Sequence, residues 1–179
     1  SQVLAGELTA FIESYRVDDI MTAIRLIDEF KLKAVLIGCA EGYKVAGEIA
    51  QRKIPVIISP FGIGPRRMET KEISISNAAV LAQKGVKIVL KSEGSLGMGN
   101  IRELPLIAAL AVKGGLDRET ALRAITLTAA EVLGVDDRIG SLEKGKEGNI
   151  VISDGDPLHY KTRIKRVLIQ GKTVYQSSK

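Results

Sequence analysis

Short apolar runs alternate with segments of helical period along the first half of the chain. Continuous apolar runs predict strands that are buried on both faces, which is typical of a parallel sheet. Four such runs occur, at residues 8–12, 34–37, 55–58 and 86–90. Between them, apolar residues recur about every 3.6 positions and predict helices, at residues 20–30, 42–52 and 77–84. Asp18 or Asp19 is expected to cap the first of these helices. The order predicts an α/β fold of four β/α units, which is half of an eight-stranded barrel.

Helices then follow one another without intervening strands. Residues 104–112 are strongly apolar and predict the first of these helices. Asp117 is expected to cap the second, because its carboxylate can accept hydrogen bonds from free backbone N–H groups. Thr128 and Glu131 have the spacing of a capping box and predict the start of a third helix, which Gly134 ends.

The pattern changes at residue 136 to short alternating strands with tight turns. Strands are expected at 149–152, 165–169 and 173–175, and the last two form a hairpin. We therefore divide the chain into an α/β region of residues 1–135 and a small β segment of residues 136–179. Three strands seldom form a stable sheet without a covering partner.

The composition excludes several classes of protein. The chain has 26 Lys and Arg against 21 Asp and Glu, a net charge of +5. These basic residues are spread out and not interleaved with aromatic residues, so we expect no nucleic-acid partner. No run approaches the about 20 apolar residues that a membrane-spanning helix needs. One cysteine excludes an internal disulfide and is typical of a reducing compartment, here the cytoplasm. One histidine excludes a metal site with several imidazoles from this chain.

Two stretches of the last third carry a family resemblance. They are Arg138 to Val151, continued by Asp154-Gly155-Asp156-Pro157-Leu158, and the hairpin sequence from Val167 to Tyr175. Together they resemble the C-terminal segment of the amidohydrolase superfamily, and within it the imidazolonepropionase-like enzymes. Weaker similarity extends upstream, as in Arg16-Val17-Asp18-Asp19-Ile20 and Glu41-Gly42-Tyr43-Lys44-Val45.

The resemblance implies a metal-dependent TIM barrel with a small β-sandwich beside it. This chain would hold barrel strands five to eight and the C-terminal strands of the sandwich. The first four strands of the family, with their His-x-His pair, are absent. The chain also starts at Ser1 without an initiator Met, which suggests a processed or truncated piece.

The resemblance places three metal-site residues at the carboxyl ends of strands, and all three differ here. Glu13 stands where the fifth strand of the family has a histidine ligand, and Gly38 stands where the sixth strand has another. The eighth strand of the family ends in Ser-Asp, whose Asp binds metal and acts as the base; here the pair is Ser92-Glu93. Glu93 is thus the candidate catalytic residue, and Glu13 with Glu93 are the candidate metal ligands.

Five other residues are candidates for roles near such a site. Arg16 and Tyr43 are candidate substrate-binding residues at strand ends, and so is Arg66, which lies in a Gly/Pro/Arg loop suited to an anionic group. Cys39 would need a nearby base to act as a nucleophile, so we expect a small buried cysteine. His159 lies in a turn of the small β segment, where we expect a surface histidine.

Two functions remain open from the sequence. The first is an amidohydrolase-like protein that has lost catalysis, binds no cofactor, and serves as a binding or structural protein. The second is a hydrolase of cyclic amides or other non-peptide C–N bonds that uses Zn²⁺, Mn²⁺ or Mg²⁺, with ligands from an N-terminal half or a partner chain. Half a barrel has open edges that need a cover, so we expect either a homodimer or association with the missing N-terminal half.

Overall fold

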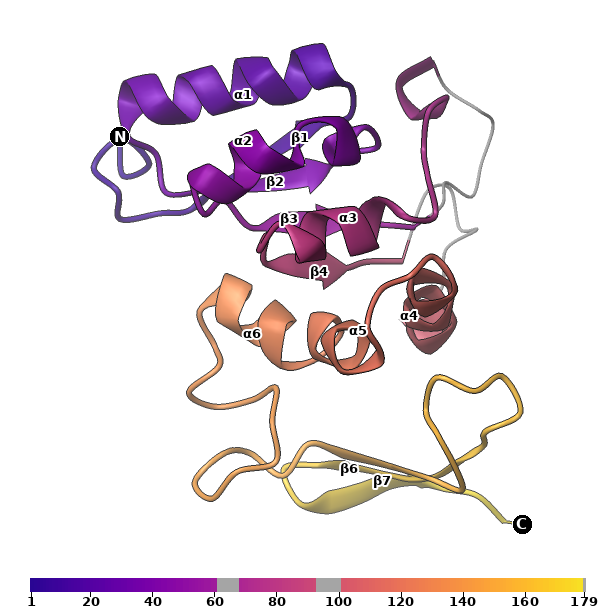
Figure 1. The fold of residues 1–179 in the computed structure, drawn as a ribbon. Helices are drawn as coiled ribbons and strands as arrows, with labels where there is room; N and C mark the ends of the chain where they lie inside the picture. The colour runs from indigo at the N-terminus through magenta and orange to yellow at the C-terminus, as the bar shows by residue number, and fades with distance from the viewer. Residues whose placement is uncertain (61–67, 93–100, 179) are drawn as a thin grey trace.

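The computed structural model describes residues 1–60, 68–92 and 101–178, and in this part of the chain a four-stranded parallel sheet forms the centre of the fold. The strands lie side by side in sequence order (Figure 1): β1 (Ala10–Ser14), β2 (Ala34–Gly38), β3 (Val56–Ile58) and β4 (Ile88–Leu90). The predicted parallel sheet is confirmed. Its first strand begins at Ala10, two residues after the predicted start, and continues to Ser14.

Three helices cover one face of this sheet. They are α1 (Val17–Phe30), α2 (Ala46–Gln51), which follows the short 3-10 turn η1 (Gly42–Lys44), and α3 (Asn77–Gln83). Helix α1 buries a stripe that includes Ile20 and Ile24 against strand residues such as Leu36. The residue before α1 is Arg16, so the expected cap at Asp18 or Asp19 is wrong; both carboxylates lie in the first turn, where the positive end of the helix dipole favours them.

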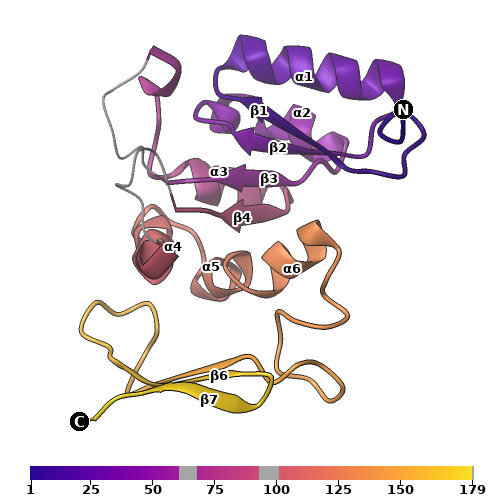
Figure 2. The ribbon, with the colours of Figure 1, turned by 180° about the vertical axis from the view of Figure 1, so that it is seen from behind.

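The other face of the sheet carries a second set of side chains. Strand residues alternate between faces, and Ile12, Leu36 and Ile58 pack into the helix-covered core. Their neighbours therefore point the opposite way, and these are Phe11, Glu13, Val35, Ile37, Ile57 and Val89. In the view from behind, the strands lie in front of α2 and α3 (Figure 2). Phe11 is 45% exposed on this face, as expected of a half-barrel whose interior is open.

A second helical group packs beside β4. It consists of α4 (Leu104–Lys113), preceded by the 3-10 turn η3 (Ile101–Glu103), then α5 (Arg118–Ala124) and α6 (Leu127–Leu133). A further 3-10 turn, η2, spans Met68–Thr70. The predicted capping box is wrong, because Thr128 lies inside α6 and Thr126 precedes it. Glu131 instead forms ion pairs with Lys87 and Arg123.

Asp117 caps α5 as the sequence predicts. Its carboxylate accepts hydrogen bonds from the backbone N–H groups of Glu119 and Thr120, at 3.1 and 2.8 Å. These bonds, with those to Thr120 the larger cause, hold the pKa of Asp117 below its ordinary value.

We expect Asp117→Ala to lower the melting temperature at pH 7 by about 2 to 4 °C, because it removes two cap hydrogen bonds. A carboxylate with a lowered pKa stabilises the fold above its unfolded pKa, and this stabilisation is lost as pH falls through the folded value. The difference in melting temperature between wild type and Asp117→Ala should therefore become smaller as the pH drops below about 4. Thermal melts across pH 2 to 7 check this, and a gap independent of pH would contradict it.

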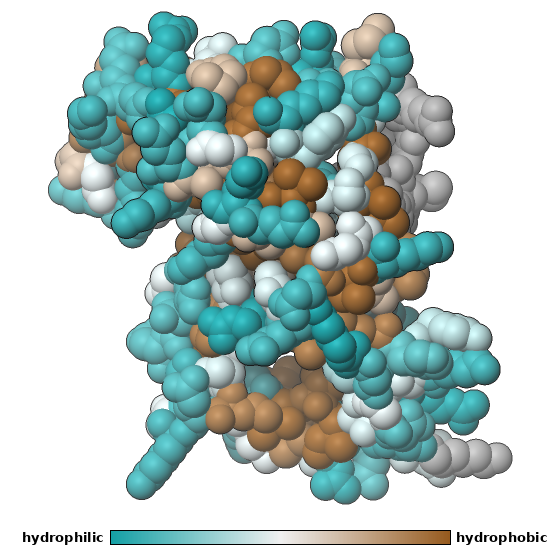
Figure 3. All heavy atoms as spheres, in the orientation of Figure 1, coloured by the Kyte–Doolittle hydropathy of each residue, from teal (hydrophilic) through white to brown (hydrophobic). Residues whose placement is uncertain are grey.

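A separate antiparallel sheet follows, of β5 (Ile150–Ser153), β6 (Ile164–Ile169) and β7 (Lys172–Gln176). The predicted hairpin is confirmed, with a shorter loop: Gln170 and Gly171 both have positive φ, as a two-residue type I′ turn requires. Figure 3 shows a hydrophobic patch near the bottom of the molecule, where this sheet lies. The exposed side chains of the sheet include Val151, Val174 and Tyr175. None of the helices among the described residues is long and apolar enough to cross a membrane.

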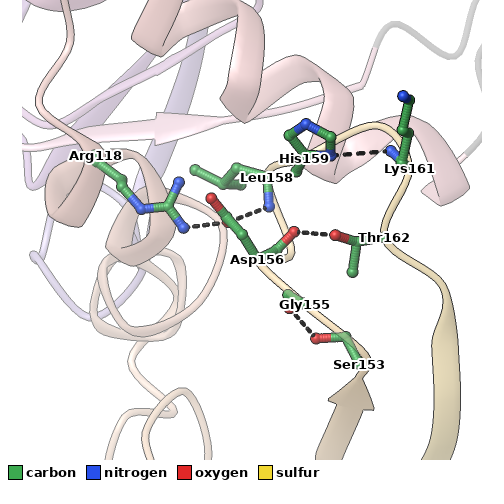
Figure 4. A network of polar contacts seen from close by, with 8 residues as sticks. All are labelled: Arg118, Ser153, Gly155, Asp156, Leu158, His159, Lys161 and Thr162. Atoms are coloured by element: carbon green, nitrogen blue, oxygen red, sulfur yellow. Dashed lines mark hydrogen bonds and ion pairs between the residues drawn. The ribbon is translucent and has the colours of Figure 1, made fainter.

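The Asp154-Gly155-Asp156-Pro157-Leu158 sequence lies between β5 and β6 and links the small sheet to α5 and the main core (Figure 4). The Asp156 carboxylate accepts hydrogen bonds from Arg118 of α5 and from the backbone N–H of Leu158, and its carbonyl accepts one from Thr162 Oγ1 at 2.6 Å. Leu158 is buried in the main core. This part of the sequence that carries the family resemblance therefore has a structural role, because it anchors the small sheet to α5 and the main core.

Candidate functional site

The carboxyl ends of β1 and β2 form the candidate site. Ser14 and Gly38 are in register at the ends of these strands, and the two loops that follow are joined by backbone hydrogen bonds. Cys39 N donates to Ser14 O at 2.6 Å, and Glu41 N donates to Tyr15 O at 2.9 Å. The Glu41 carboxylate also accepts a hydrogen bond from Val17 N at 3.1 Å. This rigid pair of loops fixes the positions of Glu13, Tyr15 and Gly38.

Glu13 lies on the open face of the sheet, near the carboxyl end of β1, as a residue at the mouth of a barrel should. Its Oε1 atom accepts a hydrogen bond of 2.5 Å from the Tyr15 hydroxyl. Glu13 itself is exposed. The carboxylate at the predicted ligand position, Glu13, therefore already accepts a hydrogen bond from Tyr15, which lies two residues further along the chain.

Gly38 has no space for a side chain. Its φ is +96°, a backbone conformation that L side chains rarely adopt. A Cβ atom built there would lie 2.9 Å from Tyr15 Cε1 and 3.0 Å from the Ser14 carbonyl oxygen. The Tyr15 ring therefore occupies the space into which a residue at position 38 would project.

These residues do not fit a metal held by imidazoles. One of the two ligand positions that the structure describes has no side chain and cannot accommodate one without movement of Tyr15 or Ser14. The other is a carboxylate that is hydrogen-bonded to Tyr15. Within residues 1–60, 68–92 and 101–178, no group of three or more His, Cys, Asp or Glu side chains is placed to hold a metal ion.

Cys39 is fully buried, which confirms the expected small buried cysteine. Burial raises the pKa of its thiol to about 12, and the neighbouring Ser14 hydroxyl only partly opposes this. The thiol is therefore protonated at neutral pH and is not an activated nucleophile.

Asn77 supports this end of the sheet, and no local sequence pattern predicts this role. Its side chain is 1% exposed, and its Nδ2 donates to the Cys39 carbonyl at 2.8 Å. In the sequence, Asn77 looks like an ordinary first residue of a helix. Only its hydrogen bond to Cys39, 38 positions earlier in the chain, shows its role.

Arg16 and Tyr43 lie at the same end of the sheet as Glu13, on the loops after β1 and β2. The Arg16 guanidinium pairs with Asp18 at 3.4 Å, and the Tyr43 hydroxyl donates to the Glu72 carbonyl at 3.3 Å. Both are rim residues with partners in the fold. Arg66 and Glu93 lie outside the described residues, so their places in the site stay predictions.

His159 lies in the connection between β5 and β6 (Figure 4). It is exposed, its Nδ1 accepts a hydrogen bond from the Lys161 backbone N–H at 3.3 Å, and its ring stacks on Tyr160. The expected surface histidine is confirmed.

Comparison with known sequences agrees with the motif-based resemblance. Residues 40–174 match the sequence profile of the Amidohydrolase family. An imidazolonepropionase of Clostridium tetani is 31% identical over 110 residues, which is 58% of this chain and 26% of that protein. A 5-methylthioadenosine/S-adenosylhomocysteine deaminase of Thermodesulfovibrio yellowstonii is 36% identical over 86 residues, 44% of this chain and 20% of that protein. The chain thus spans about a quarter of these curated relatives.

Solved structures show the same fold. An amidohydrolase from Thermotoga maritima superimposes with a TM-score of 0.89 at 33% identity, over 98% of this chain and 45% of its own. An adenosine deaminase from Xanthomonas campestris with bound zinc has a TM-score of 0.68 at 20% identity, over 93% of this chain and 45% of its own, which shows the fold alone. The described fold therefore corresponds to less than half of each of these two chains.

Proposed function

Because this chain belongs to the amidohydrolase family, we propose that it is a member that has lost metal-dependent hydrolysis and serves as a binding or structural protein. The observation that carries the proposal is the contact between Tyr15 and Gly38. A histidine ligand at position 38 would need the space of the Tyr15 ring and a negative φ, and the chain provides neither. Tyr15 also holds Glu13 through its hydroxyl.

The two substitutions support each other physically. Glycine at position 38 leaves room for an aromatic ring, and the ring brings a hydrogen-bond donor to the carboxylate at position 13. A site that had lost one ligand by chance would instead leave a cavity or an unpartnered group, which costs stability. The contacts of Tyr15 with Gly38 and Glu13 therefore favour a stable arrangement at the mouth of the half-barrel that needs no metal.

Metal analysis tests the proposal. We expect protein purified without chelator to contain no stoichiometric divalent metal, and its melting temperature to be unchanged by Zn²⁺ or Mn²⁺. A ligand that binds only the folded state at one hundred times its dissociation constant stabilises it by about 2.7 kcal/mol, so real binding would be visible. Stoichiometric metal that is lost in Glu93→Ala would overturn the proposal in favour of the hydrolase.

We also propose that another polypeptide covers the open face, either a second copy of the chain in a homodimer or the N-terminal half of a longer protein. Phe11 on the open face and Val151, Val174 and Tyr175 on the second sheet are all 45% or more exposed. Both sheets thus leave large apolar side chains uncovered, as surfaces that bind another polypeptide do. The single buried cysteine is consistent with a cytoplasmic location.

Light scattering on the purified 179-residue chain measures this association. A dimer at micromolar concentration is the expected result, because a lone half-barrel leaves its strand edges unpaired. A monodisperse monomer would contradict the homodimer and leave the N-terminal half of a longer protein as the proposed cover.

A further inference from the structure

A cavity of about 300 Å³ lies at the amino ends of the strands, at the opposite end of the sheet from the Glu13 site. These ends lie on the left in Figure 1, where α6 also approaches the sheet. The cavity is bounded by the residues just before β1 to β4 and by parts of α6 and of the segments that follow α1 and α2.

The cavity combines an apolar wall with an excess of positive charge. Its apolar lining includes Ile27, Leu32 and Ile54. Four cationic side chains and a single carboxylate also line it, and these are Lys33, Arg52, Lys53, Lys87 and Glu131.

Two of the four cations are already neutralised. Lys87 Nζ lies 2.8 Å from Glu131 Oε2. Arg52 pairs with Asp28 and with Glu48, each at 2.7 Å. Across the described ranges, Lys33 and Lys53 have no ion pair.

These two lysines come before neighbouring strands, Lys33 directly before β2 and Lys53 in the turn between α2 and β3. Leu36 pairs with Val56 in the parallel ladder, and each lysine precedes one of these residues by three positions. Two like charges that line one cavity repel each other.

We propose that this cavity binds a small organic phosphate monoester, with the phosphate between Lys33 and Lys53 and the carbon part against the apolar wall. Two ammonium groups that line one cavity and have no ion pair within the described ranges match a dianion, whereas a carboxylate would neutralise only one of them. The volume equals about ten water molecules at roughly 30 Å³ each, which is enough for a phosphate with a few carbon atoms. The site is independent of the proposed loss of hydrolysis, because it shares no residue with the Glu13 mouth.

Isothermal titration of the protein with glycerol 3-phosphate, at constant ionic strength, tests the site. We expect saturable binding by the wild type, none with glycerol, and competition by inorganic phosphate but not by chloride. Lys33→Gln and Lys53→Gln should each raise the dissociation constant at least fivefold, and Lys33→Arg should restore binding to within twofold. Lys31→Gln, an exposed neighbour that does not line the cavity, is the matched control and should bind like the wild type.

A second measurement separates the site from a loss of folding. Without ligand, Lys33→Gln and Lys53→Gln should melt at or slightly above the wild-type temperature, because each removes a repulsion. The proposal is overturned if the wild type shows no saturable binding, if the Lys33→Gln/Lys53→Gln double variant binds as tightly as wild type, or if Lys31→Gln weakens binding equally.

Discussion

Gly38→His should destabilise the protein by about 3 kcal/mol or more. Position 38 has a φ of +96°, and a non-glycine residue in the left-handed region costs about 1–2 kcal/mol. The new side chain must also displace the Tyr15 ring or the Ser14 carbonyl, which its Cβ would approach within 2.9 and 3.0 Å, and overpacking of this kind typically costs about 1–3 kcal/mol. Urea denaturation of wild type and variant measures the difference in free energy of unfolding.

Two further variants separate the causes. Gly85 has a φ of +83°, and no atom lies within 4 Å of the place that a Cβ would take, so Gly85→Ala reports the backbone cost alone. Gly38→Ala should lower the free energy of unfolding more than Gly85→Ala does. This excess should largely disappear when Tyr15 is also replaced by Ala, because the effects of substitutions at two residues in contact are not additive. Equal costs for Gly38→Ala and Gly85→Ala would show that Tyr15 does not fill the position.

Gly114→Ala is the second substitution with a large expected effect, again about 3 kcal/mol or more. Gly114 follows α4 with a φ of −77°, which any residue adopts, so the backbone itself is not strained. Its Cβ, however, would lie 2.1 Å from the Ile75 carbonyl oxygen and 2.7 Å from its carbonyl carbon. Because the obstructing atoms are backbone, relief requires the segment before α3 to move away from α4.

Gly47→Ala is the matched control for Gly114→Ala. Gly47 lies inside α2, and no atom is within 4 Å of the added Cβ. Alanine should therefore stabilise the helix by about 0.5–1 kcal/mol. If the free energy of unfolding of Gly114→Ala lies within about 0.5 kcal/mol of the wild-type value, then α4 and the segment before α3 are not packed as closely as described.

The order of elements could be predicted because it depends on local patterns. Four continuous apolar runs with helices between them indicated a parallel sheet, and that sheet is observed. Asp117 could be identified as a cap because its hydrogen bonds reach only two and three residues ahead. The hairpin was visible for the same reason, since its turn residues Gln170 and Gly171 lie between two alternating strands.

Local patterns failed where distant side chains competed. Thr128 and Glu131 have the spacing of a capping box, yet Glu131 pairs with Lys87, 44 positions earlier in the chain, and with Arg123. The start of α1 was misplaced because Asp18 and Asp19 both resemble caps, while the strand end at Ser14 allowed the helix to begin at Val17.

The sequence by itself determined the family and the alternation of strands and helices, and it predicted which ligand positions implied by the resemblance carry other residues. Only the tertiary structure decided that Tyr15 fills the space at Gly38, that Asn77 supports Cys39, and that Lys33 and Lys53 line one cavity. The reason is physical: strand and helix patterns arise from neighbours along the chain, whereas these contacts join residues 20 or more positions apart, which only the packed fold brings together.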